Sequence, residues 1–181
     1  MQQARYSPVA RALHWLIAIL VIVNWRIVEA TEGLPRAERI EIMGKHMALG
    51  IVILVLVLVR LGWRLAHKPP ELSAALKPWE RVLAKTVHAI FYVLLIGMPL
   101  AGWLASSFLG RGVDIFGLFT LPALPVAANP DIGKEIFEVH GTFGTILLIL
   151  IAVHVLGSLK HTFIDKDGNL FRMLPWGTPK A

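Results

Sequence analysis

The chain contains no cysteine. This absence among 181 residues excludes thiolate-held iron–sulfur clusters, haem attached through a Cys-x-x-Cys-His motif, thiolate zinc sites and structural disulfides. Charge is also scarce, because only 17% of the residues are Asp, Glu, Lys or Arg, whereas soluble domains carry about 25%. Neither a G-x-G-x-x-G loop nor a P-loop occurs, which argues against NAD(P)H or ATP as a direct partner. Histidine, present seven times, is the remaining soft metal ligand.

Apolar residues dominate what is present. They make up 56% of the chain and the mean hydropathy is +0.65, a balance typical of integral membrane proteins. Four apolar stretches approach the roughly 20 helical residues that cross a hydrocarbon core of about 30 Å. They cover residues 9–29, 44–64, 82–106 and 136–159. We therefore predict an all-α membrane protein, a four-transmembrane-helix bundle that forms a single domain over residues 1–181.

The segments between these stretches are short and polar or rich in proline and glycine. No small-residue cleavage site follows the first apolar run, so we expect it to be retained as a helix. Pro99 is expected to bend the third helix near its end. The segment of residues 107–133 has the composition of a surface loop lying over one end of the bundle.

The distribution of charge predicts the orientation. The side that holds both termini carries twelve of the 18 Lys and Arg residues and four of the 12 acids, a net of +8 against −2 on the other side. By the positive-inside rule both termini are cytoplasmic, and we expect a multi-pass protein of the bacterial inner membrane. The overall charge of +6 is then explained by topology, so we expect no nucleic-acid partner.

Most of the histidines fall within or beside the apolar stretches, where an ionisable group is costly and indicates function. His140 and His154 are fourteen residues apart, which on a helix is about 21 Å of rise and a return to within about 40° of the same face. His46 matches the outer level of His140, and His14 matches the inner level of His154. Two pairs of imidazoles from different helices, at two depths, are what two b-type haems in a bundle require.

Alternatives remain open for several of these residues. His88 has about the same inner depth as His154 and competes with His14 as the inner ligand; it is otherwise a contact for a haem propionate or a quinone. His161 lies at the cytoplasmic interface, where a propionate, a quinone or a proton exit is expected, although a solvated histidine fits equally. His67 is expected to be a solvated loop residue. A single intramembrane histidine is more often a hydrogen-bonding or proton-path residue than a haem ligand.

At these residues the sequence resembles the bacterial cytochrome b561 family, which is related to the cytochrome b subunits of hydrogenases and formate dehydrogenases. The matching segments are ALHW, MGKHMALGI, VHAIFYVLLIGMPLAGW, EVHGTFG, VHVLGSLKH and the tail KDGNLFRMLP. The resemblance implies two haem b groups, with iron held by His14 and His154 in the inner haem and by His46 and His140 in the outer haem. Many relatives have paired histidines in the tail, where this chain has only His161.

The resemblance further implies a membrane electron-transfer protein that carries single electrons between a small periplasmic donor and ubiquinone. Some family members resemble superoxide oxidases, so superoxide is the candidate donor and the expected enzyme is a superoxide/ubiquinone oxidoreductase. Arg111 and Lys134 are then candidates for steering an anion to the outer haem, although ordinary loop charges are the simpler interpretation of either one.

Two other functions compete with this one. The first is a cytochrome b subunit that relays electrons for a separate dehydrogenase or hydrogenase partner, and the second is a proton or metal transporter. Transport is disfavoured because every Asp and Glu lies in or beside a predicted loop, whereas carriers need acidic groups along an aqueous path.

Overall fold

Four long helices make up most of the protein in the computed structural model, which describes residues 5–72 and 76–177. They are α1 (Pro8–Glu29), α2 (Arg36–Ala66), α3 (Pro78–Phe108) and α4 (Pro130–Phe163). A two-stranded hairpin, β1 (Val113–Ile115) and β2 (Phe119–Leu121), and a short 3-10 helix, η1 (Asn169–Arg172), complete the elements. All four α-helices are long and apolar enough to span a membrane, so the prediction of an all-α four-helix membrane bundle is confirmed.

Proline and polar caps set where the helices begin. α1, α3 and α4 each have proline in the first helical turn, where the missing N–H is not needed. The Ser7 hydroxyl accepts a hydrogen bond from the Ala10 amide at 3.3 Å, and the Asn129 side chain accepts one from Ile132 at 3.2 Å. These side chains satisfy amide groups that otherwise have no partner in the helix.

The helices extend beyond the apolar stretches. α2 has 31 residues and α4 has 34, about 46 and 51 Å at the usual rise, so both exceed a hydrocarbon core of about 30 Å. Their additional turns are polar: α2 begins at Arg36, eight residues before the apolar stretch that predicted it. Hydropathy therefore identified only the part of each helix that crosses the membrane. Both helices continue beyond it, where water or headgroups solvate their polar side chains. α3 runs without a break through Pro99.

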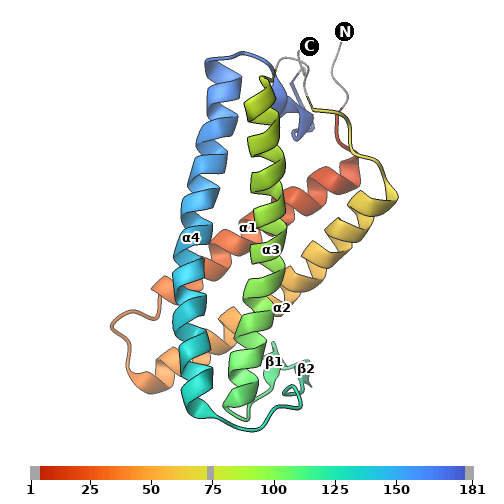
Figure 1. Ribbon diagram of the computed structural model, residues 1–181. Helices are drawn as coiled ribbons and strands as arrows, with labels where there is room; N and C mark the ends of the chain where they lie inside the picture. Colours follow the sequence, from red (N-terminus) through yellow and green to blue (C-terminus); the bar gives the residue numbers. More distant parts are fainter. Residues whose placement is uncertain (1–4, 73–75, 178–181) are drawn as a thin grey trace.

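The helices form two antiparallel pairs that cross each other. Figure 1 shows α3 and α4 side by side, with α1 and α2 running obliquely across them. Within the described residues the closely packed helix pairs are α1 with α2, α2 with α3, and α3 with α4. A core of Ile17, Leu49, Ile53 and Val57 lies where α1 and α2 meet, and Tyr92 of α3 packs against it. Among the long helices of the described chain, α4 therefore packs closely with α3, and it also contacts η1.

One end of the bundle joins the two ends of the described chain. The Tyr6 amide donates to the Arg172 carbonyl at 3.2 Å, and the Trp15 indole N–H donates to the Met173 carbonyl at 2.8 Å. Arg11 reaches the Leu174 carbonyl at 2.8 Å. We call this the terminal end and the opposite end, where α3 leads into β1, the hairpin end (Figure 1).

The segment expected to be a surface loop is partly ordered as the hairpin. Val113 pairs with Leu121 and Ile115 with Phe119 in an antiparallel ladder. Val113 and Ile115 are buried against Ala48 of α2, with Trp103 packed beside them. The Trp103 indole N–H donates to the Pro122 carbonyl at 3.0 Å, which fixes the end of the hairpin to α3.

Candidate functional site

Near the hairpin end, the imidazoles of His46 and His140 face each other across the bundle. Their ring centroids are 6.0 Å apart with planes at 82°. The Nδ1 atom of His46 lies 3.2 Å from the backbone oxygen of Asn24. Because a carbonyl can only accept, this bond requires Nδ1 to carry the proton, which leaves Nε2 with its lone pair free. Gly102 of α3 lies beside the other ring, since a Cβ there would be 3.5 Å from Cε1 of His140.

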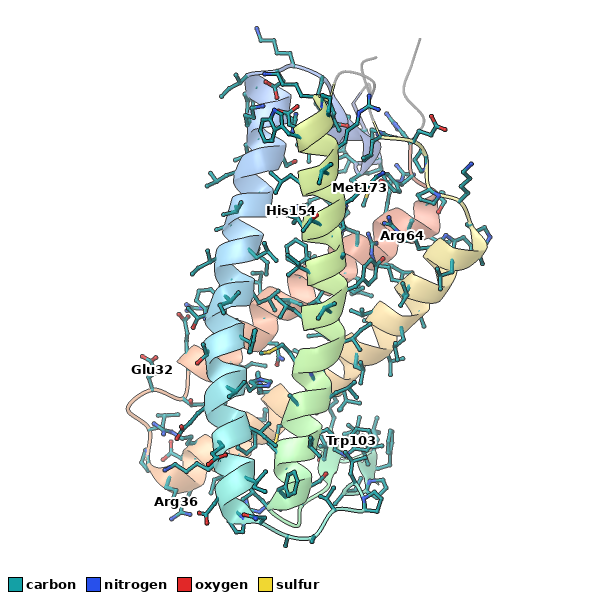
Figure 2. All side chains as sticks on the ribbon, viewed as in Figure 1. Glu32, Arg36, Arg64, Trp103, His154 and Met173 are labelled. Carbon is teal, nitrogen blue, oxygen red and sulfur yellow. The ribbon has the colours of Figure 1, made fainter. Side chains whose placement is uncertain are left out.

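Three imidazoles meet at the second level, nearer the terminal end. The centroid of His154 is 6.3 Å from that of His14 and 6.1 Å from that of His88. Phe91 packs edge-on against His154 at 5.4 Å. Figure 2 shows His154 between α3 and α4, about one third of the way down from the terminal end. Distance alone therefore does not distinguish the two partners of His154.

The helices that carry these histidines differ in how closely they pack. His46 and His140 belong to α2 and α4, and His14 and His154 belong to α1 and α4; neither helix pair is among the closely packed pairs of the described chain. His88 and His154 belong to α3 and α4, which are closely packed. A flat macrocycle between two imidazoles keeps the backbones that carry them apart. The close α3–α4 contact works against this for the third pair, whereas no close helix contact works against it for the first two.

The separations also fit a metal held between two rings. Two imidazoles bound to opposite sides of one first-row metal ion, with metal–nitrogen bonds of about 2 Å, have centroids roughly 6 Å apart. The measured values of 6.0 and 6.3 Å agree with this. Neutral imidazole nitrogen is a usual ligand of haem iron, so these side chains are donors of the kind that b-type haem needs.

His161 lies in a different setting, at the terminal end of α4. Its Nδ1 atom is 2.9 Å from carboxylate oxygens of both Asp165 and Asp167. Lys160 Nζ donates at 2.8 Å to Glu80 of α3, and lies at the same distance from Asp165. His161 is therefore partly buried beside two carboxylates and the Lys160–Glu80 ion pair, and it is not freely solvated.

The other charged candidates lie on the surface. Arg111 is exposed at the start of the hairpin segment, and Lys134 is 3.9 Å from Glu138 one helical turn later, with both side chains largely exposed. The nearby acid offsets part of the Lys134 charge, so its attraction for an anion is weakened. His67 is exposed and stacks on Trp63 with a centroid distance of 3.8 Å, in agreement with a surface role.

Two residues near the imidazoles were not singled out from the sequence. Asn24 supplies the carbonyl for His46, and its side-chain Oδ1 is buried without a hydrogen-bond partner. Arg60 donates to the Ala10 carbonyl at 2.6 Å and lies within electrostatic range of both His14 and His88. A polar side chain within an apolar run was the available signal for Arg60, whereas the contact of Asn24 is made by its backbone carbonyl and has no signal in the sequence.

The protein has four apolar helices, and imidazoles from different helices lie close together between them. These features define an integral membrane protein of the helical-bundle class. The family model described as prokaryotic cytochrome b561 matches residues 5–176. The chain therefore belongs to the prokaryotic cytochrome b561 family, as the sequence motifs indicated. It is a multi-pass membrane electron-transfer protein, and b-type haem is the cofactor of the family.

Curated relatives agree over nearly their whole length. The chain is 30% identical over 173 residues to a protein of Yersinia pestis named probable superoxide oxidase CybB, covering 94% of this chain and 96% of that protein. It is 29% identical to cytochrome b561 homolog 2 of Escherichia coli strain K12, covering 94% and 91%. It is also 29% identical to cytochrome b562 of Cereibacter sphaeroides, covering 96% and 97%.

Proposed function

We propose that this protein binds two haem b groups, one at each level of facing imidazoles. His46 and His140 would hold the haem nearer the hairpin end, and His14 and His154 the haem nearer the terminal end. The carrying observation is that both pairs have the separation of a bis-imidazole metal site and join helices that are not closely packed. Bound haem supplies reversible one-electron chemistry, and the chain supplies the ligands and an apolar enclosure.

The choice of His14 over His88 rests on helix packing. A macrocycle between His88 and His154 would have to separate α3 from α4 along their close contact, whereas α1 and α4 already stand apart. His88 then lies beside the haem edge, within electrostatic range of Arg60 and Arg64. This grouping suits a haem propionate or a quinone oxygen, because both accept hydrogen bonds and carry negative charge in one of their states.

The function that this arrangement supports is electron transfer across the membrane to ubiquinone. The donor would act at the hairpin end, taken as periplasmic from the charge distribution, in the bacterial inner membrane. Superoxide is the candidate donor, since a full-length relative carries the name probable superoxide oxidase. Arg111 and Lys134 would attract the superoxide anion weakly at the hairpin end. At the terminal end, His161 would lie near bound quinone or on the path of the protons that the quinone takes up.

The balanced reaction is the oxidation of two superoxide anions to two O₂ while one ubiquinone takes two electrons and two protons to become ubiquinol. The test uses purified protein in liposomes containing ubiquinone, with superoxide generated in the buffer. We expect two low-spin b haems per chain and one ubiquinol formed for every two superoxide anions consumed.

Several outcomes would contradict the proposal. One haem per chain would remove the two-level assignment. Two haems without ubiquinol formation from superoxide would reject the donor, and ubiquinol formation only with a co-purified dehydrogenase would identify a relay subunit instead. The variant His67→Ala, at an exposed position away from both imidazole pairs, is the matched control and should keep both haems and full activity.

A further inference from the structure

The turn of the β1–β2 hairpin is apolar and uncovered. Phe116, Leu118 and Phe119 are 53%, 80% and 60% exposed, and they follow one another with only Gly117 between them. The other side of the same hairpin is anchored, because Val113 and Ile115 are buried against α2. A turn that exposes three large apolar side chains to water is unfavourable, so the surroundings of this turn need an explanation.

The backbone of the turn shows that an aromatic residue is placed there at a conformational cost. Phe116 and Gly117 both have positive φ, +53° and +74°, and the Leu118 amide donates to the Ile115 carbonyl at 3.0 Å. Two successive positive φ values are typical of a type I′ turn, where Asn, Asp or Gly is preferred at the first position. A bulky residue in this conformation is a true outlier. More than half of Phe116 is exposed, so burial within the protein offsets only part of this cost.

The hairpin lies at the depth of the membrane boundary. Its buried residues pack against Ala48, and Ile51 of the same helix lies beside them. Lys45 is the last charged residue of α2 before its uncharged run. Ala48 and Ile51 follow Lys45 by three and six residues, so they lie about 4.5 and 9 Å deeper in the membrane than Lys45. Figure 1 shows the hairpin alongside the end of α3 and not beyond it. Trp103, labelled in Figure 2 at this level, is of the residue type that favours membrane interfaces.

We propose that the hairpin turn, residues 116–119, inserts into the interfacial layer of the phospholipid bilayer at the hairpin end. The bilayer covers the exposed apolar side chains, which offsets the cost of the Phe116 conformation. The Asp114 carboxylate, which accepts a hydrogen bond from the Gly117 amide at 2.8 Å, stabilises the turn that presents these side chains. The hairpin thereby anchors that end of α2 and α3 to the lipid surface, independently of any bound cofactor.

The absence of cysteine from the chain makes a direct test possible. Single-cysteine variants Leu118→Cys, Val55→Cys and Glu32→Cys each carry one nitroxide label in protein reconstituted into phospholipid nanodiscs. Val55 is an exposed residue in the middle of α2 and serves as the lipid reference, and Glu32 is exposed in the loop after α1 and serves as the water reference. Collision rates with O₂, which prefers lipid, and with a water-soluble nickel chelate are measured by electron paramagnetic resonance.

We expect the ratio of O₂ to nickel collisions at position 118 to exceed that at position 32 several-fold and to lie below that at position 55, as befits the interfacial layer. A ratio equal to that at position 32 would show that the turn is in water and would overturn the proposal. Protection from both reagents would also overturn it, because a second copy of the chain would then cover the turn.

A second variant separates lipid insertion from a purely structural role. Phe116→Gly relieves the backbone strain and removes the aromatic ring. In this background the label at position 118 should become several-fold more accessible to nickel, while the thermal stability in detergent is unchanged or higher. Unchanged accessibility would show that Phe116 does not hold the turn in lipid, and a large loss of stability would show that Phe116 serves the fold.

Discussion

The Nδ1 atom of His46 lies 3.2 Å from the backbone carbonyl oxygen of Asn24, 22 residues earlier in the chain. A histidine that binds a metal commonly donates its other ring N–H to a carbonyl, which fixes the ring orientation. This contact joins α1 to α2, and the ring centroid of His46 lies 6.0 Å from that of His140. A contact between the neighbouring helices α1 and α2 thus restrains the ring of His46, which lies near His140 of α4.

Loss of either imidazole at this level should remove the same haem. We expect His46→Ala and His140→Ala each to lower the haem content from two to one per chain, because a single axial ligand cannot hold a low-spin bis-imidazole iron. Reduced-minus-oxidised spectra and potentiometric titration identify which haem is missing. Loss of spectroscopically different haems in the two variants would show that these histidines do not form one pair.

At the other level, the two candidate partners of His154 should behave differently. His14→Ala should remove one low-spin haem, whereas His88→Ala should keep both and change only the potential or the quinone reaction. The reason is that α3 and α4 pack closely along their length, so a macrocycle between His88 and His154 would have to separate them. Retention of both haems in His14→Ala, with loss in His88→Ala, would reverse the assignment.

A third prediction concerns the space beside His140. A methyl group at Gly102 would make only van der Waals contact with the ring, at 3.5 Å, so Gly102→Ala should bind haem normally. The larger Gly102→Leu should displace the imidazole and deplete one haem. Gly97→Leu on the same helix is the control, because no atom outside its own helix lies within 4 Å of a Cβ there. Equal haem loss in both leucine variants would mean that the effect is not local to His140.

The fourth prediction concerns stability at the terminal end. Glu80 is nearly buried, accepts a hydrogen bond from Lys160 at 2.8 Å, and accepts a second from the Lys77 amide at 3.0 Å. Glu80→Ala removes both bonds and should lower the melting temperature in detergent. Glu41→Ala breaks an exposed pair with Lys45 and should leave it unchanged, since exposed ion pairs contribute little. Equal melting temperatures would show that the link between α3 and α4 is not important for stability.

All four membrane-spanning helices were predicted from the hydropathy of the sequence. A membrane forces its crossing segments into helices because unpaired backbone groups are too costly in lipid, so four apolar stretches led directly to four helices. The polar extension of α2 and the hairpin were not predicted. The extension of α2 was missed because hydropathy changes too gradually at the membrane boundary to mark where a helix ends. The hairpin was missed because it depends on the packing of Val113 and Ile115 against α2, which is distant in the sequence.

The sequence likewise predicted that His46 lies at the level of His140 and His14 at the level of His154, because helical rise converts sequence position into depth. The structure brings His88 equally close to His154, so the pairing of His14 with His154 stays a prediction. The sequence by itself determined the lipid-spanning class of this protein and the level of every imidazole, since one residue along a helix always advances the same distance. Only the tertiary structure decided which helices stand apart and which pack closely, and that three imidazoles meet at the second level. That separation depends on side chains from three helices meeting at once, and no single segment contains this information.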